Sequence, residues 1–287
     1  MRVLHLDSGL EMRGGQWQAL RLHQGLISEG HESVLLAREG SPLLQRGAEP
    51  LRVRHLRTLS RSFDLVHAHD ARSHTIGAIL SRVPLVVSRR VAFAVRNSAV
   101  SRWKYRVPAL FLAVSRYVAE RLRAAGVPDQ RIAVVYDGVP VPAEPANGPD
   151  ILIPDTADPA KGAALAESAA QLAGITLKRS SSLEADMPQA RALVYLSHSE
   201  GLGSGILLGM AHGLTVIASD VGGIPELIDD GINGILVPNE ENAVKNALWH
   251  IDPQLGKAAR ETVLARFTVE HMVRSTVAAY ERALAHA

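Results

Sequence analysis

The 287-residue sequence predicts two α/β domains, each built on a parallel, doubly wound sheet. Short apolar runs alternate with helical segments along the chain, which is the pattern of repeated strand–helix units. A stretch rich in proline and glycine at residues 139–149 interrupts the alternation, and neither helix nor strand runs through such a stretch. The length suits two domains of about 100–200 residues each. We therefore predict a first domain over residues 1–142, a second over residues 143–267 and a C-terminal helix over residues 268–287.

The first half contains the longer series of expected strands. Helical periodicity indicates helices at residues 16–28 and 116–125. Apolar runs of strand length occur at residues 3–6, 33–37, 51–55, 65–67, 85–87, 111–114 and 132–135.

The second half begins a new alternation and is short. Its last forty residues are helical, with one apolar stripe that includes Met272 and Tyr280. The expected strands lie at residues 151–153, 175–178, 193–196, 214–218 and 235–237.

Composition limits the class of protein. The chain has no cysteine, which excludes disulfides and thiolate metal sites and fits a reducing compartment. No apolar run approaches the roughly 20 residues that span a bilayer, and the N-terminal residues read as a first strand instead of a signal peptide. These features lead us to expect a soluble, cytoplasmic protein.

Charge is distributed unevenly although the formal net charge is only +2. Residues 1–145 carry 21 Lys and Arg against 12 Asp and Glu, whereas residues 146–287 carry 10 against 17. Between Asp70 and Glu120 there are nine basic residues and no acidic one. A field of one sign attracts anions such as phosphorylated glycans, lipid headgroups or nucleic acid. A merely solvated basic face is the alternative interpretation.

The most informative segment covers residues 193–237, where an apolar strand leads through a glycine-rich turn into a helix. The turn holds Gly201, Gly203 and Gly205, and a second strand is followed by Gly222 and Gly223 and by a short helix that we expect from Ile224. Backbone N–H groups at a helix start carry partial positive charge, and glycines let the backbone approach a phosphate closely. Two adjacent units of this kind predict an anion site at the carboxyl ends of parallel strands.

This segment resembles the donor-site signature of the retaining glycosyltransferases of family 4. The matching positions are Glu200-Gly201-Leu202-Gly203, Met210-Ala211, Gly213, Val216-Ile217-Ala218-Ser219, Gly222-Gly223, Glu226, Gly231 and Gly234-Ile235-Leu236-Val237. Two positions depart from the family's pattern. Leu208 stands where the family has its second glutamate, and Thr156 stands where it has an arginine that contacts donor phosphate.

The resemblance implies the GT-B architecture, in which two Rossmann-like domains face each other across a cleft and the last helix packs back toward the first domain. It implies transfer of a sugar from a nucleotide-diphosphate sugar, with retention and with neither a metal nor a further cofactor. We expect an anionic glycan or lipid-linked acceptor, as in lipopolysaccharide or envelope polysaccharide synthesis, because the first half is basic. Peripheral contact with an anionic membrane at its inner face is a further expectation, and nucleic acid is not expected as a partner.

The resemblance also assigns residues to the donor. Lys161 is placed to contact the phosphates, and Glu200 to accept hydroxyl groups of the sugar. Arg90 follows a strand at a position where many members carry a histidine, and its guanidinium could replace the clamp lost at Thr156. We assign Glu200, Arg90 and Lys161 to catalysis. The donor-binding set is Gly14, Gly15, Lys161, Glu200, Gly201, Leu202, Gly203, Gly222 and Gly223.

The acceptor is expected at the first domain, and its candidate residues are His69, Asp70, Arg89, Arg96 and Trp103. Alternatives remain open for each group. Lys161 could be a surface lysine, Glu200 a turn cap, Gly14-Gly15 a tight turn, the two arginines a basic turn, and Trp103 an anchor of an amphipathic helix. His67 and His69, with Asp70, would make at best a partial metal site, and no metal is predicted.

Three other functions compete with sugar transfer. A degenerate relative could bind a glycan or partner without donor chemistry, since Leu208 and Thr156 both weaken the donor site. A nucleotide-sugar epimerase would share the architecture and need no acceptor. Nucleic-acid binding by the basic half would show steep salt dependence.

Overall fold

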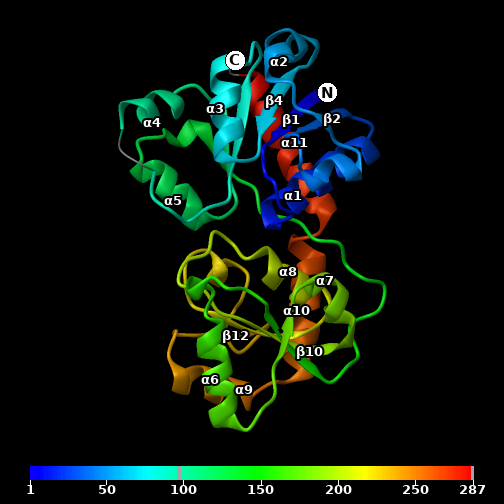
Figure 1. The fold of residues 1–287 in the computed structure, drawn as a ribbon, viewed down its shortest axis with the longest axis vertical. Helices are drawn as coiled ribbons and strands as arrows, with labels where there is room; N and C mark the ends of the chain where they lie inside the picture. The colour runs from blue at the N-terminus through cyan, green and yellow to red at the C-terminus, as the bar shows by residue number, and fades with distance from the viewer. Residues whose placement is uncertain (96–97, 286–287) are drawn as a thin grey trace. The chain divides into compact units, whose positions relative to one another are not determined.

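The computed structural model describes residues 1–95 and 98–285. The chain divides into two compact units. Unit 1 comprises Met1–Asp137 and Val269–Ala287, and unit 2 comprises Gly138–Thr268 (Figure 1). Each unit contains one parallel sheet with helices between successive strands, so the predicted fold class of two doubly wound α/β domains is confirmed.

Unit 1 is built on a seven-stranded sheet with the order β3-β2-β1-β4-β5-β6-β7. Its helices are α1 (Gly14–Ser28), α2 (Val53–Leu59), α3 (Ala71–Leu80), α4 (Ala99–Lys104), α5 (Arg116–Ala124) and α11 (Val269–Ala285). The strands are β1 (Arg2–Asp7), β2 (Glu32–Ala37), β3 (Glu49–Pro50), β4 (Leu65–Ala68), β5 (Leu85–Arg89), β6 (Leu110–Ala113) and β7 (Ile132–Val134).

The helix α11 belongs to unit 1 although it ends the chain. Its buried stripe, which includes Met272, Val273 and Tyr280, joins one hydrophobic cluster with Leu22 of α1 and Val86 of β5. Burial of such side chains contributes roughly 1.5–3 kcal/mol each. The C-terminal helix therefore completes the core of the first unit.

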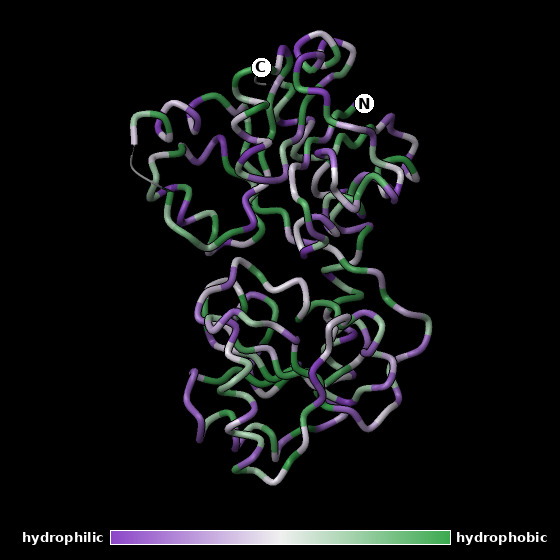
Figure 2. The backbone as a smooth tube through the Cα atoms, viewed as in Figure 1, coloured by the Kyte–Doolittle hydropathy of each residue, from purple (hydrophilic) through white to green (hydrophobic). Residues whose placement is uncertain are grey.

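Unit 2 has five strands in the order β12-β11-β10-β8-β9. The apolar centre of its sheet is visible in Figure 2 as a run of green segments. The strands are β8 (Asp150–Pro154), β9 (Lys178–Ser180), β10 (Ala190–Tyr195), β11 (Thr215–Ser219) and β12 (Ile235–Val237). The helices are α6 (Ala163–Ala173), α7 (Leu183–Asp186), α8 (Ser204–Ala211), α9 (Glu241–Leu248) and α10 (Pro253–Arg266).

The proline-rich stretch at residues 139–149 lies in unit 2, and the division between the units falls after Asp137. Its backbone is bonded to that unit: the N–H of Ala146 donates to the carbonyl of His212, and the Arg260 guanidinium donates to the carbonyls of Pro142 and Ala143. Side-chain and backbone donors thus replace the ladder bonds that prolines prevent.

Two secondary-structure predictions are wrong. The strand expected at residues 51–55 is instead the start of α2, in which only Leu56 is buried, so the alternating pattern carried too few buried positions to define a strand. The helix expected from Ile224 is a three-residue 3₁₀ turn, Ile224–Glu226, after which the chain turns at Leu227.

Within residues 1–95 and 98–285, no helix is both long and apolar enough to cross a membrane.

Candidate functional site

The candidate donor site of unit 2 lies where the strand order reverses. Strands β8 and β10 are neighbours in the sheet, but the chain continues from β8 toward β9 on one side and from β10 toward β11 on the other. The loops that leave their carboxyl ends therefore separate, which is where open α/β sheets bind ligands. The N–H of His198 donates to the carbonyl of Ala160 at 2.9 Å and joins these two loops.

Lys161 and Glu200 meet at this point, one from each loop. The Nζ of Lys161 lies 2.7 Å from Oε2 of Glu200, and both side chains are only partly exposed. The hydroxyl of Tyr195 donates to the same carboxylate oxygen at 3.3 Å. Burial, followed by the Glu200 charge, raises the pKa of Tyr195, so its hydroxyl keeps its proton and remains a donor. The structure brings together the cation and the carboxylate that the sequence assigns to the donor.

Glycines shape the backbone around this pair. Gly203, at φ 105°, caps the N-terminus of α8 directly after Gly201 and Leu202, both of which are buried. Gly162 has φ 62°, and a Cβ there would lie 2.6 Å from Cβ of Leu196. Lys161 ends a 3₁₀ turn and α6 begins at Ala163. The first N–H groups of both helices are thus presented at the same edge of the sheet as Lys161.

Gly222 and Gly223 support the loop that carries Glu200. The N–H of Gly223 donates to the Glu200 carbonyl at 3.1 Å, and a Cβ on Gly222 would lie 2.0 Å from that carbonyl oxygen. Both glycines contact the backbone of Glu200, and the close approach of its carbonyl oxygen excludes a side chain at Gly222.

The G222A variant is expected to lose about 3 kcal/mol of unfolding free energy or more, because the strain of φ 62° adds to the clash with Glu200. Gly231 is the matched control: it has φ 70°, but its Cβ would meet no described atom within 4 Å. G231A should therefore cost only about 1 kcal/mol. Urea unfolding of both variants measures the difference, and equal losses would contradict the close approach at Gly222.

A pocket of about 410 Å³ opens beside the start of α6. Thr156 lines it together with Ser197, His198 and Arg179. The Arg179 guanidinium is bonded to Glu167 at 2.6 Å and 2.7 Å and to Asp155 at 3.2 Å. The arginine missing at Thr156 is therefore not replaced by a free cation at Arg179, whose charge is already paired.

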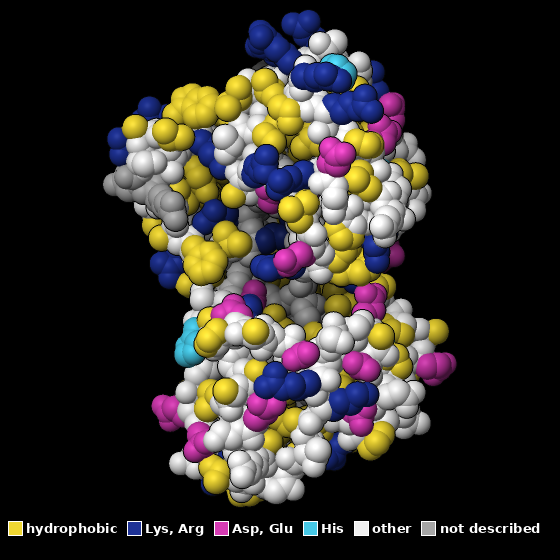
Figure 3. Space-filling view, viewed as in Figure 1, with side chains coloured by type: hydrophobic (Ala, Val, Ile, Leu, Met, Phe, Trp, Pro, Cys, Tyr) yellow, Lys and Arg dark blue, Asp and Glu magenta, His cyan; other side chains and the backbone are white. Residues whose placement is uncertain are grey.

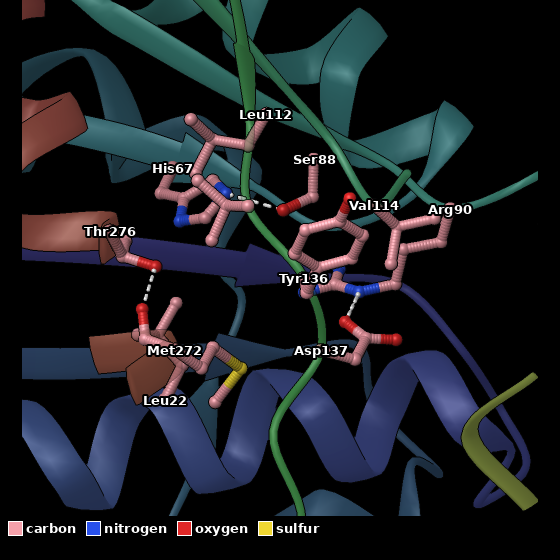
Figure 4. Close-up of a pocket in the computed structure, with 11 residues that line it drawn as sticks. Leu22, His67, Ser88, Arg90, Leu112, Val114, Tyr136, Asp137, Met272 and Thr276 are labelled. Atoms are coloured by element: carbon pink, nitrogen blue, oxygen red, sulfur yellow. Dashed lines mark hydrogen bonds and ion pairs between the residues drawn. The ribbon is translucent and has the colours of Figure 1, made fainter. Parts of the chain in front are cut away.

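In unit 1, Arg90 is held by two buried acceptors. Its Nε donates to Oδ1 of Asp137 at 3.0 Å, and the two side chains are 15% and 8% exposed (Figure 4). Its Nη1 lies 3.4 Å from Nδ1 of His69. Asp137 fixes the plane of the guanidinium by a charge-assisted bond. Asp137 was not identified from the sequence, because its partner Arg90 lies 47 residues away in the chain.

His69 continues a chain of hydrogen bonds into the core. A guanidinium can only donate, so Nδ1 of His69 accepts and its proton is on Nε2. Nε2 of His69 lies 2.9 Å from Nδ1 of His5, which must then accept, so His5 carries its proton on Nε2. That Nε2 has no hydrogen-bond partner among the described residues.

One ring nitrogen from each of His5, His67 and His69 lies within 4.8 Å of the other two, so these residues could hold a metal ion. Asp70, expected beside them, is instead turned away to cap α3. His67 is bonded through Nδ1 to the Tyr280 hydroxyl at 2.6 Å. Its Nε2 is bonded to the Ser88 hydroxyl at 2.8 Å (Figure 4). Five of the six ring nitrogens thus have partners within the described residues, and a metal would have to displace some of them.

These histidines should make the protein sensitive to mild acid. Burial lowers the pKa of His5 to about 3 and lowers those of His67 and His69 well below 6.5. Below pH 6.5 the unfolded chain takes up protons that the folded protein cannot, so their contribution to stability is complete above pH 6.5 and is lost as the pH falls toward the folded values. Between pH 7 and pH 5 the unfolding free energy should therefore fall, by about 2 kcal/mol from His5 and by a further amount from His67 and His69.

Urea unfolding at pH 7 and pH 5 measures this loss. The H5Q variant should show a loss smaller by about 2 kcal/mol, since one titrating group is gone. Equal unfolding free energies at the two pH values would show that the three rings are protonated in the folded protein.

The expected acceptor residues that the structure describes have different surroundings. Asp70 accepts from the N–H of Ser8 and of Arg72, and from the Ser73 hydroxyl. Burial acts to raise its pKa, but the bonds from Ser73 and Ser8 outweigh it and the pKa lies below its usual value. Arg89 donates to the Tyr105 hydroxyl and to the Phe93 carbonyl. Trp103 is 45% exposed on α4, whereas His69 is buried. Arg96 lies outside the described residues.

Gly14 and Gly15 begin α1 directly after the loop that follows β1. The residue before them, Arg13, makes no side-chain cap, so the first N–H groups of this helix are not satisfied by a capping side chain. A Cβ on Gly15 would meet no described atom within 4 Å, so the loop does not require a glycine there for packing.

The two parallel α/β units define the GT-B fold class, and solved glycosyltransferases have the same fold. The Anabaena protein HepE in complex with UDP and glucose matches at a TM-score of 0.84 and 17% identity, over 98% of this chain and 99% of that one. Sucrose-phosphate synthase from Thermosynechococcus elongatus matches at 0.77 and 16%, over 100% of both chains. The lipopolysaccharide outer core galactosyltransferase WaaB matches at 0.70 and 15%, over 98% and 100%.

Family models identify both halves of the sequence. Residues 12–141 match the model described as Glycosyltransferase Family 4, and residues 154–251 match the model described as Glycosyl transferases group 1. The chain belongs to the family 4 glycosyltransferases. Alpha-maltose-1-phosphate synthase of Mycolicibacterium smegmatis is 34% identical over 106 residues, which are 32% of this chain. That match spans 27% of the relative's length.

Proposed function

We propose that the protein transfers a sugar from a nucleotide-diphosphate sugar to an anionic glycan or lipid-linked acceptor, as in lipopolysaccharide or envelope polysaccharide synthesis. The main support is the Lys161–Glu200 pair at 2.7 Å, which lies at the switch point of the sheet in unit 2 beside the glycine loop and the start of α8. The complexes of HepE with UDP, glucose and UDP-glucose make a uridine nucleotide the first donor to test.

In this proposal Lys161 neutralises the departing diphosphate, with the N–H groups at the start of α8 as further donors. Glu200 accepts hydroxyl groups of the transferred sugar. The bond between the anomeric carbon and the phosphate oxygen breaks, the acceptor oxygen forms the new bond, and the acceptor proton passes to the departing phosphate. We propose retention of configuration and no metal, by analogy with the family. The absence of cysteine from the sequence agrees with action in a reducing compartment such as the cytoplasm.

The experiment is a panel of nucleotide sugars, tested first by calorimetry and then by mass spectrometry for transferred sugar with glycan and lipid-linked acceptors. Binding of a donor together with release of its nucleotide only when an acceptor is present supports transfer. Release of an epimerised free sugar without acceptor would instead identify an epimerase.

A second candidate is a glycan-binding relative without donor chemistry, which Leu208 and Thr156 favour. Leu208 offers no acceptor for ribose hydroxyl groups, and each lost charge-assisted bond costs roughly 1.5–3 kcal/mol. If no nucleotide sugar of the panel binds, this candidate replaces the first.

A further inference from the structure

The helix α4 is unusual in unit 1 because none of its six residues, all of which the structure describes, is buried. Ser98 caps it by accepting from the N–H of Ser101 at 3.1 Å. Val100 and Trp103, three positions apart and so on one face of the helix, are 68% and 45% exposed. Burial of an apolar stripe normally stabilises so short a helix, and here the stripe is uncovered.

The exposed apolar surface extends beyond the helix. Phe93 is 70% exposed, and Arg89 binds both the Phe93 carbonyl and the hydroxyl of Tyr105, the residue that follows α4. Phe93 is thereby held close to the end of α4. Val91 and Val107, at 43% and 39%, flank the segment. We call Val91, Phe93, Val100, Trp103 and Val107, with the exposed Arg102 and Arg106, the α4 surface.

The segment of the sequence that carries this surface is basic. Nine basic residues and no acidic one lie between Asp70 and Glu120. Figure 3 shows hydrophobic side chains next to Lys and Arg over the part of unit 1 that carries α4. Apolar and aromatic side chains with interspersed cations match the interface of an anionic bilayer, where rings enter the headgroup region and cations meet the phosphates.

The α4 surface is also held firmly from beneath. Lys104 donates to the carbonyl of Ala71 at 2.5 Å, and Nε2 of His74 lies 3.1 Å from the Lys104 carbonyl. Arg131 donates to the carbonyls of Arg106 and Pro108 at 2.8 Å and 3.2 Å. Hydrogen bonds to the rest of unit 1 therefore fix the backbone of this surface, while its apolar side chains are exposed. Such a preorganised surface loses little conformational entropy when it binds a partner.

We propose that the α4 surface binds the surface of an anionic phospholipid bilayer. Phe93, Val100 and Trp103 supply the apolar contact, and Arg102 and Arg106 supply the attraction to lipid phosphates. The proposal goes beyond sugar transfer and does not depend on it, because binding to lipid needs neither donor nor acceptor.

The test is cosedimentation of the full chain with large vesicles of phosphatidylcholine alone, or with about one third phosphatidylglycerol. We expect partition onto the anionic vesicles only, and weaker partition when salt rises well above about 0.1 M. The F93S/W103S double variant should lower the partition coefficient about tenfold or more. The R102Q/R106Q double variant should lower it by a similar factor.

Two matched controls separate the surface from general properties of the chain. I79S removes a side chain of α3 that is 61% exposed, and R54Q/R57Q removes two charges from α2. Both should partition like the unchanged protein, and circular dichroism should show all variants folded.

Three results would overturn the proposal: no partition onto anionic vesicles, the same loss in the controls as in F93S/W103S, or a dimer in light scattering that F93S/W103S dissociates. The last would identify a second copy of the chain as the occupant. None of these three results changes the binding of UDP that calorimetry measures with the unchanged protein. Failure of the bilayer proposal would therefore not affect the proposed donor chemistry.

Discussion

Replacing Lys161 by alanine is expected to lower kcat/KM for the donor by about a thousandfold, if Lys161 neutralises the leaving diphosphate. A preorganised donor of this kind typically contributes a factor of about 10²–10³ to turnover. Binding of UDP, measured by calorimetry, should weaken by about ten- to a hundredfold, because the ammonium also contacts the ground-state phosphates. Transfer rates at saturating and limiting donor separate the two effects.

The ion pair with Glu200 sharpens this test. Since Glu200 accepts from Lys161 at 2.7 Å, the E200Q variant removes the carboxylate charge and leaves the ammonium to the nucleotide. E200Q should therefore keep or strengthen UDP binding while it lowers the transfer rate. K245A, which removes a lysine of α9 that lies over the Trp249 ring, is the control and should leave both measurements unchanged. Weakened UDP binding in E200Q together with normal binding in K161A would refute the assigned roles.

Replacing Arg90 by lysine is expected to lower kcat/KM by about a hundredfold. Lysine keeps the charge but loses the planar fork that Asp137 and His69 hold from two sides. D137N keeps the shape of the acceptor and removes its charge, so it should reduce turnover through Arg90 and not through a lost contact of its own. Rates of both single variants and of R90K/D137N form a double-mutant cycle.

In that cycle the two losses should not add, because both act on the position of one guanidinium. Urea unfolding at pH 7 measures how much of each loss of turnover comes from a lower stability of the fold. Turnover of R90K equal to that of the unchanged protein would contradict the assignment of Arg90 to catalysis, and additive losses would contradict Asp137 as its positioning residue.

Much of the fold could be predicted because its signals are local. The alternation of apolar runs and helical segments predicted β1, β2, β4 to β8 and β10 to β12. The strand expected at residues 51–55 failed because none of these five residues is buried, and the side chain that α2 buries is Leu56, one position further on. The expected strand at residues 175–178 overlaps β9 only at Lys178, since an exposed three-residue edge strand carries little apolar pattern.

The residues of the candidate site also differ in how far they could be predicted from local signals. Lys161, Glu200 and the glycines lie in contiguous motifs, and the sequence presents them together. The sequence did not identify four members of the donor-site cluster in unit 2 and the histidine–arginine cluster in unit 1, namely His5, Asp137, Tyr195 and Tyr280. Their roles come from partners on other strands and helices: His67 lies 213 residues from Tyr280, and His5 lies 64 residues from His69.

The sequence by itself determined the two doubly wound units and the glycine-rich, cationic chemistry of the donor motif, because periodicity and motif spacing are properties of neighbouring residues. Only the tertiary structure decided that Arg90 is held between Asp137 and His69, that three histidines form one buried network, and that α4 leaves its apolar face uncovered. These features depend on which strands become neighbours in a sheet and on which side chains are then removed from water. Neither the strand neighbours nor the burial can be inferred from a single stretch of the chain.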